Sequence, residues 1–284
     1  MKKLNLFVFV IVLFFWSCDT TKEQIPAYVH VKPFVVNVNP NQGTADADIK
    51  DVTFFAESEG FLGTYELPAT FPVLLEGNSK LLLDPGIRLN GINSTPSIYP
   101  FLNRYEINVD LSPNQVDTIQ PVTTYDSRVN FAYVEDFETT NTLTVKLDTS
   151  QTSSVGTVND GAFEGKSAKF TVNESNPLFE IASLERMELP TNGDIVYLEM
   201  NYKNESLLQV GLVGYKNNNP ITTYIIALNP SSEWKKIYVE LTQELISVDP
   251  GITDFQVLYG AQLQAGQTSA DFFIDNVKVL HADI

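Results

Sequence analysis

The chain has 284 residues, of which 18 are Lys or Arg and 35 are Asp or Glu, so its formal net charge at pH 7 is −17. This surplus of acid excludes nucleic acid as a partner, because affinity for phosphate backbones comes mainly from Lys and Arg. A single cysteine excludes a disulfide framework within the chain, so stability must come from buried cores.

The chain begins with a targeting segment. Lys2 and Lys3 precede an apolar run, Leu4 to Trp16, that ends at Ser17-Cys18. The run is shorter than the roughly 20 residues that span a bilayer, which favours a signal peptide over a permanent membrane helix. Removing residues 1–17, which carry two lysines and no acid, takes the net charge from −17 to −19.

The junction at Cys18 resembles that of bacterial lipoprotein signals. The resemblance implies a signal peptide over 1–17, a covalent lipid such as palmitate on Cys18, and a lipidated tether over 18–24. It also implies a place on the membrane of a Gram-negative-type cell envelope, most consistently the outer membrane. The alternative is an ordinary secretory signal that ends in a cysteine by chance.

Residues 25–127 have the composition of a β-sandwich, with short Val-, Ile-, Phe- and Tyr-rich runs separated by turn residues. The strands predicted there are 28–31, 35–38, 52–55, 71–75, 80–83 and 105–111. The turns predicted between strands are 39–43, 76–78, 84–86 and 112–114. The segment 92–105 carries Tyr99 and Phe101 beside two prolines, and we expect it to pack on a core rather than to form an exposed binding loop.

Within this part, the sequence predicts a hairpin, then a proline that begins the next edge, then a glycine turn. The segments concerned are 60–68, 76–83 and Pro85-Gly86. The succession resembles that of PEGA-type, transthyretin-like or immunoglobulin-like surface modules. Such modules usually serve as spacers or adhesion surfaces, so the resemblance implies a sandwich without catalytic residues.

Residues 128–284 continue the β pattern at a different spacing. The strands predicted there begin at Phe131 and continue at 168–172, 195–202, 207–215, 222–228, 234–241, 254–259 and 271–280. A short helix is predicted at 241–246. The fold class is therefore all-β, with two β-sandwich domains, an immunoglobulin- or transthyretin-like sandwich followed by a jelly roll.

Four segments of this second part resemble strands of the galactose-binding-like jelly rolls of carbohydrate-binding modules. They are 135–138, 165–170, 234–239 and 272–279. The resemblance implies a structural Ca²⁺ where an early acid and a late aspartate converge, since calcium takes carboxylate and carbonyl oxygens. By position the ligands are Glu138 and Asp275, with Asp136 as a substitute and Lys166 through its carbonyl. The alternative is that Asp275 only hydrogen-bonds the edge of the sheet.

The same resemblance implies a polysaccharide partner. Glycan binding needs aromatic faces for sugar C–H groups and polar side chains for hydroxyls. We expect Trp234 to lie in the core, because it begins an alternating strand. The predicted ligand-binding residues are therefore Tyr202, Gln209, Tyr215, Tyr224 and Tyr259.

No catalytic motif accompanies these residues. The two histidines, His30 and His281, lie near opposite ends of the chain, and the sequence has no G-x-S-x-G elbow, phosphate loop or dinucleotide fingerprint. The sequence thus predicts a membrane-anchored, non-catalytic surface lipoprotein whose jelly roll captures glycan. The alternative is a structural or assembly subunit that contacts envelope proteins and binds no sugar.

Overall fold

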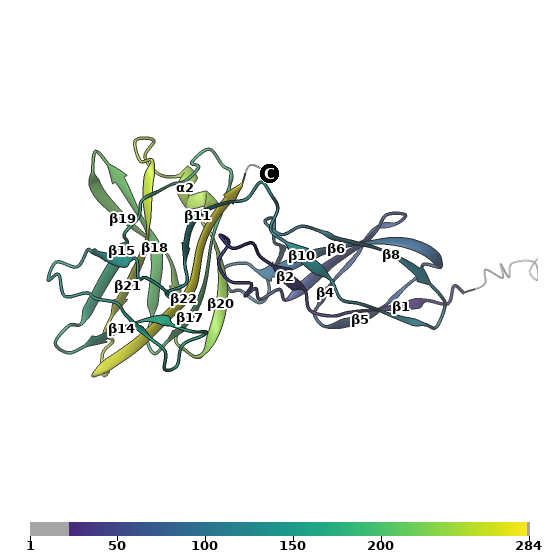
Figure 1. The fold of residues 1–284 in the computed structure, drawn as a ribbon, viewed down its shortest axis with the longest axis horizontal. Helices are drawn as coiled ribbons and strands as arrows, with labels where there is room; N and C mark the ends of the chain where they lie inside the picture. Colours follow the sequence, from purple (N-terminus) through teal and green to yellow (C-terminus); the bar gives the residue numbers. More distant parts are fainter. Residues whose placement is uncertain (1–22, 283–284) are drawn as a thin grey trace, which may run out of the picture.

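The computed structural model describes residues 23–282, so the predicted signal peptide and Cys18 lie outside the described residues. The fold is all-β, as predicted, and consists of two β-sandwich domains joined along the long axis of the molecule (Figure 1). In the part of the chain from 23 to 282, no helix has the length and apolar character needed to cross a bilayer.

The first domain packs a three-stranded sheet against a five-stranded sheet. The smaller sheet has the order β5 (Ala69–Val73), β1 (Ala27–Val31), β9 (Val116–Ile119). The larger contains β4 (Gly60–Glu66), β3 (Asp51–Ala56), β6 (Gly77–Arg88), β7 (Pro96–Ile98) and β8 (Tyr105–Leu111). A separate ribbon pairs β2 (Val35–Asn37) with β10 (Val122–Thr124). Alternate residues such as Val29, Phe54 and Leu81 point between the two sheets and form the core.

The prediction of a turn at 84–86 is wrong, because these residues lie inside β6. On one side β6 pairs with β8 as far as Leu83 and with β7 from Gly86 onward. Pro85 lies between these two pairings, where its missing N–H costs the sheet no hydrogen bond on that side. The proline therefore marks a change of partner strand and not the end of a strand.

The second domain is a jelly roll made of two sheets. One sheet, here called the interface sheet, contains β13 (Gly156–Val158), β14 (Ser167–Asn173), β22 (Ser269–Ala282), β17 (Ile195–Asn204) and β20 (Ser231–Glu240), with β11 (Asn130–Glu135) on β22. The other, the distal sheet, contains β12 (Leu143–Lys146), β15 (Leu178–Ser183), β21 (Asp254–Gln262), β18 (Leu208–Lys216) and β19 (Asn219–Leu228), with β16 (Met187–Glu188) on β21. The predicted domain boundary falls between β10 and β11.

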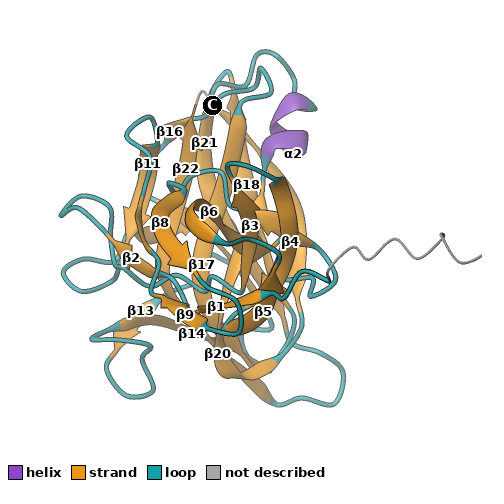
Figure 2. Ribbon diagram, turned by 90° about the vertical axis from the view of Figure 1, so that its right-hand side faces the viewer, coloured by secondary structure: helices purple, strands orange, loops and turns teal. Residues whose placement is uncertain are grey.

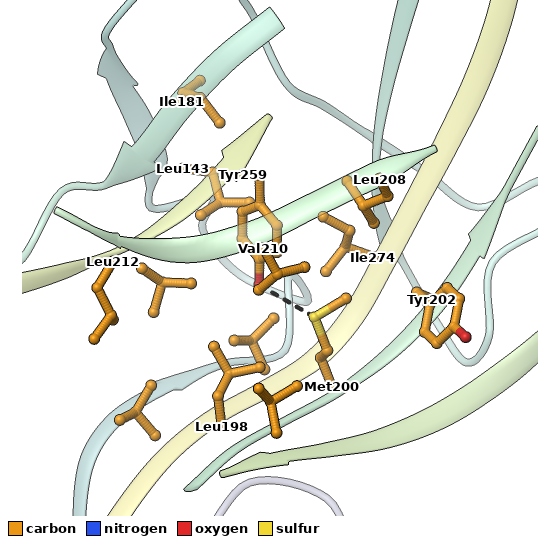
Figure 3. Packing of buried hydrophobic residues seen from close by; sticks show 14 of the residues in the cluster. Leu143, Ile181, Leu198, Met200, Tyr202, Leu208, Val210, Leu212, Tyr259 and Ile274 are labelled. Atoms are coloured by element: carbon orange, nitrogen blue, oxygen red, sulfur yellow. Dashed lines mark hydrogen bonds between the residues drawn. The ribbon is translucent and has the colours of Figure 1, made fainter. Parts of the chain in front are cut away.

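The helix predicted at 241–246 is confirmed as α2 (Thr242–Ile246), which lies at one end of the jelly roll (Figure 2). The main core lies between the two sheets, where large side chains such as Phe272, Tyr259 and Met200 are fully buried. Figure 3 shows part of this cluster, with side chains from the two sheets pointing toward one another. Such close packing fixes which face of each strand can meet solvent.

In the segment 92–105, Tyr99 and Phe101 are packed, as expected, but against the second domain, whereas Ile92 and Ile98 are exposed. Tyr99 and Phe101 are 1% and 0% exposed and lie in a core shared by both domains. The ring of Tyr99 is 4.9 Å from that of Tyr238 on β20 and 5.5 Å from that of Tyr197 on β17, centroid to centroid. The first domain therefore covers one end of the outer face of the interface sheet.

A buried polar network accompanies this apolar contact. Glu199 of β17 is 0% exposed, and it accepts hydrogen bonds from the hydroxyls of Tyr99 and Tyr125 of the first domain. In return Lys278 of β22 donates to the carbonyl of Thr44 at 2.7 Å. Separating the domains would leave Glu199 without two of its donors. This would cost stability, because a buried carboxylate is unfavourable unless it is hydrogen-bonded. The two domains thus form a single packed unit.

Candidate functional site: the outer face of the distal sheet

The outer face of the distal sheet points away from the first domain (Figure 1). Strand alternation puts Leu208, Val210 and Leu212 of β18 in the core, so Gln209 and Tyr215 lie on the outer face. Tyr224 of β19 pairs with Gly211 of β18 and lies on the same face. Three of the predicted ligand residues therefore share one face, although Gln209 and Tyr215 lie six residues apart along β18.

Tyr224 lies over a glycine of the sheet. A Cβ built on Gly260 of β21 would be 2.2 Å from the Tyr224 hydroxyl oxygen and 2.7 Å from its Cζ and Cε1 atoms. The phenol end of the ring therefore occupies the space that any other residue at 260 would fill. Gly211 has a different role, because a Cβ there would meet the Thr223 carbonyl oxygen at 2.0 Å, so this glycine lets the backbone of β19 approach β18 closely.

The hydroxyl of Tyr224 donates to Oε1 of Glu180 on β15 at 2.7 Å. Burial and the neighbouring Glu180 carboxylate both raise the pKa of Tyr224 well above its usual range. The phenol thus stays protonated and remains a donor at any physiological pH. The ring itself is half-buried, so part of it faces solvent beside Gln209, which pairs with Gly260.

Tyr215 is more enclosed than Tyr224. The guanidinium carbon of Arg186 lies 3.4 Å from the centroid of its ring, and the Tyr215 hydroxyl donates to the side-chain oxygen of Gln256. Only 9% of Tyr215 is exposed. Tyr215 pairs with Asp254, six residues along β21 from Gly260, and Arg186 covers its ring, so Tyr224 is the more accessible tyrosine of this face.

The prediction that Tyr259 binds ligand is wrong, and Tyr202 belongs to the interface sheet, away from the Tyr224 face. Tyr259 precedes Gly260 and so points inward, where it is 0% exposed and its hydroxyl lies 3.7 Å from Sδ of Met200 (Figure 3). Tyr202 is 8% exposed and belongs to the same core, although it also lines a groove between the two domains. Both face the interior because of the period of two along a strand.

Sequence reasoning missed Glu180, Arg186 and Gly260. A glycine inside an apolar strand marks a close approach of another group, so Gly260 carried a usable signal. Trp234 also departs from expectation. It lies on the outer face of the interface sheet with Tyr238, whereas Ile237 and Val239 point into the core.

The predicted calcium ligands do not all meet at one place. Asp136 and Glu138 line a hollow of about 320 Å³ with Glu164, Asn276 and Thr44 of the first domain. Oε1 of Glu138 accepts the Lys166 backbone N–H at 2.7 Å, and the Lys166 ammonium donates to the Glu138 carbonyl at 2.9 Å. These bonds involve the nitrogens of Lys166, so the expectation that its carbonyl binds an ion stays a prediction.

Asp275 is fully buried beside this hollow but does not line it. Its carboxylate accepts from the hydroxyl of Ser167 at 2.6 Å and from the Asn276 N–H at 2.8 Å. Burial raises its pKa to about 6 despite these bonds. Among residues 23–282, no group of three or more His, Cys, Asp or Glu is placed to hold a metal ion. One feature fits an ion in the hollow, because the side-chain oxygen of Asn276 is buried without a hydrogen-bond partner.

No protein-family model matches the sequence, and no curated protein matches it. Among solved structures, the xylan-binding domain of carbohydrate-binding module family 22 aligns with 14% identity and a TM-score of 0.36, over 54% of this chain and 96% of its own. The family 11 module from Clostridium thermocellum, in complex with a β-1,3-1,4-mixed-linked tetrasaccharide, aligns with 15% identity and a TM-score of 0.35, over 51% and 92%.

The enzymatically active domain of tailspike protein 4 from bacteriophage CBA120 aligns with 13% identity and a TM-score of 0.35. The alignment covers 54% of this chain but only 19% of the tailspike chain. Identities and TM-scores this low do not assign a ligand, so the function of the distal sheet is argued from its own residues.

Proposed function

We propose that the protein is a membrane-anchored, non-catalytic surface lipoprotein whose jelly roll captures glycan on the outer face of the distal sheet. The observation that carries this proposal is the position of Tyr224 over Gly260, with its hydroxyl fixed by Glu180. A ring held in this way presents a preorganised apolar surface, and a ligand that stacks on it orders few new side chains.

The surroundings of Tyr224 suit a sugar. A sugar ring has apolar C–H groups on its faces and hydroxyls at its rim, so it needs an aromatic ring next to donors and acceptors. Gln209 and Glu180 flank Tyr224 and supply such groups, and Arg186 stands on Tyr215 in the same face. The lipid on Cys18 would supply the membrane contact, since a chain this acidic gains nothing from anionic lipid.

Structural calcium belongs to the proposal as well. The ion would lie in the hollow beside the middle of β22, near Asp136, Glu138 and the unpartnered oxygen of Asn276, and the acids would have to move closer together to hold it, because no three acids among residues 23–282 are placed to do so. It would fasten the strand ends and Thr44 of the first domain. It would have no part in glycan contact, because the hollow does not belong to the distal sheet.

The test is a glycan array probed with residues 19–284, followed by calorimetry on each glycan that binds. Tyr224→Ala is expected to weaken binding about tenfold to a hundredfold, which is about 1.4–2.8 kcal/mol. The matched control is Tyr28→Ala, which removes a half-buried tyrosine from β1 of the first domain. If the array shows no polysaccharide, the alternative of an envelope assembly subunit is supported; if Tyr224→Ala binds like the parent protein, the site is wrong.

A further inference from the structure

A groove of about 500 Å³ lies between the two domains, on the sheet opposite to the Tyr224 face. Its lining includes Trp234, Phe163 and Asn201 of the jelly roll and Arg88 and Asn93 of the first domain. Neither domain alone encloses it. The groove is thus a product of the docking described above, and the proposed function makes no use of it.

The aromatic wall of the groove is held in place. The Trp234 and Phe163 rings meet edge to face, with centroids 5.6 Å apart, and the ring of Phe273 lies 6.3 Å away. The indole N–H donates to the Gly161 carbonyl at 3.2 Å, and the Lys203 ammonium lies 5.3 Å from the indole centroid. These contacts fix the indole in one orientation while it remains only half-buried.

The polar wall offers donors and acceptors in pairs. Four cations line the groove, and three of them have a carboxylate beside them: Lys50 has Asp48 at 2.6 Å, Arg88 has Asp51 at 3.0 Å and Lys236 has Asp46 at 3.5 Å. The fourth is Lys235. A ligand group that both donates and accepts can bridge such pairs, and a hydroxyl does both.

One of these pairs is loosely bonded. The side chain of Lys236 is 2% exposed, yet its three recorded contacts, to Asn201, Asp46 and Glu199, are 3.4–3.5 Å long. Oδ2 of Asp46 is buried and has no hydrogen-bond partner. Buried polar atoms are normally satisfied, so a small opening of the groove would let a ligand hydroxyl supply the partner that these groups lack.

We infer that this groove is a second saccharide site, shared by both domains, in which a neutral pyranose unit stacks on Trp234. The first domain is then part of a binding site and more than a spacer. This inference goes beyond the proposed function and does not depend on the Tyr224 face, because the two sites lie on opposite sheets.

The chain provides its own probe for the test. It has two tryptophans, Trp16 and Trp234, so Trp234 is the only one in residues 19–284. The probes are neutral hexasaccharides of β-1,4-linked glucose, xylose and mannose, titrated to 10 mM while indole emission is recorded. We expect at least one probe to change the emission saturably. Asn93→Ala, an exposed change in the first domain, should weaken that response about threefold.

Two further variants separate the sites. Tyr224→Ala should leave the emission change intact, and Trp234→Tyr, which keeps a ring, should retain more binding by calorimetry than Trp234→Ala. No saturable change with any neutral probe would overturn the inference, as would a response confined to uronic acid oligomers or one that Asn93→Ala does not weaken. If Tyr224→Ala abolishes binding in calorimetry and no probe changes the indole emission, the Tyr224 site is supported and only the groove site is rejected.

Discussion

Replacing Gly260 by alanine tests the geometry of the Tyr224 face with one methyl group. The new Cβ would lie 2.2 Å from the Tyr224 oxygen, well inside van der Waals contact, so the ring must leave its place. The move breaks the 2.7 Å hydrogen bond to Glu180. A bond to a charged group contributes about 1.5–3 kcal/mol, reduced here because Tyr224 is half-exposed.

Alanine also regains some stability, since glycine inside a strand is about 0.5–1 kcal/mol less favourable. We therefore expect a net loss near 1 kcal/mol, which lowers Tm by about 2–4 °C in a chain of this size. The effect on glycan binding should be larger, about tenfold, because the displaced ring no longer presents its face. Scanning calorimetry measures the first quantity and titration calorimetry the second.

The control is Gly156→Ala on β13, where an added Cβ would meet nothing nearer than 3.9 Å and stability should not fall. A double-mutant cycle is decisive, because the clash needs the tyrosine ring. In the Tyr224→Ala background, Gly260→Ala should cause no further loss of Tm or affinity. The reasoning is refuted if it lowers Tm equally in both backgrounds, or if Gly260→Ala alone binds glycan like the parent protein.

Three further predictions concern the rest of the molecule. Phe101→Ala should destabilise by about 3–5 kcal/mol and leave one calorimetric transition, because Phe101 lies in the core shared by the domains; two separate transitions would contradict this. Burial raises the pKa of Asp275 from 3.8 to about 6, so the protonated side chain favours the folded state, and this stabilisation is lost as pH rises from about 4 to about 6. Asp275→Asn should remove that part of the dependence of Tm on pH. Superimposable Tm profiles of the variant and the parent protein would contradict this prediction. EDTA should lower Tm of the parent protein and have less effect on Glu138→Gln, and an unchanged parent Tm would reject calcium.

Alternation along single strands was enough to predict most of the jelly roll. Strand β18 shows why, since Leu208, Val210 and Leu212 recur with a period of two and must share the core. The same period puts Tyr259 and Gly260 on opposite faces of β21, but it does not predict which of these two faces is turned toward the core. That depends on which strands are neighbours, and β21 lies between β15 and β18, which are distant in sequence. Long-range pairing of this kind leaves no local signal.

Trp234 shows a second limit. Strand β20 is buried on its outer face at Tyr238 and half-open at Trp234, because the first domain covers only one end of the interface sheet. A sequence contains the residues of such an interface but not the docking angle that decides which of them are covered. Tyr99 and Phe101 were recognised as packed, yet their partners, Tyr197 and Tyr238, come from the other domain.

The docking also decides how the two proposed sites could act on a lipid-anchored protein. Strand β1 begins at the end of the first domain farthest from the jelly roll, so an anchor at Cys18 would lie at that end and the distal sheet at the other (Figure 1). The shared core and the bonds to Glu199 keep the domains from swinging, so the Tyr224 face would point away from the membrane. The Trp234 groove opens on the opposite sheet, at the junction of the domains. One stiff glycan chain cannot reach both, so an affinity gain from occupying both sites requires two chains or a flexible one, and a short hexasaccharide should bind each site independently.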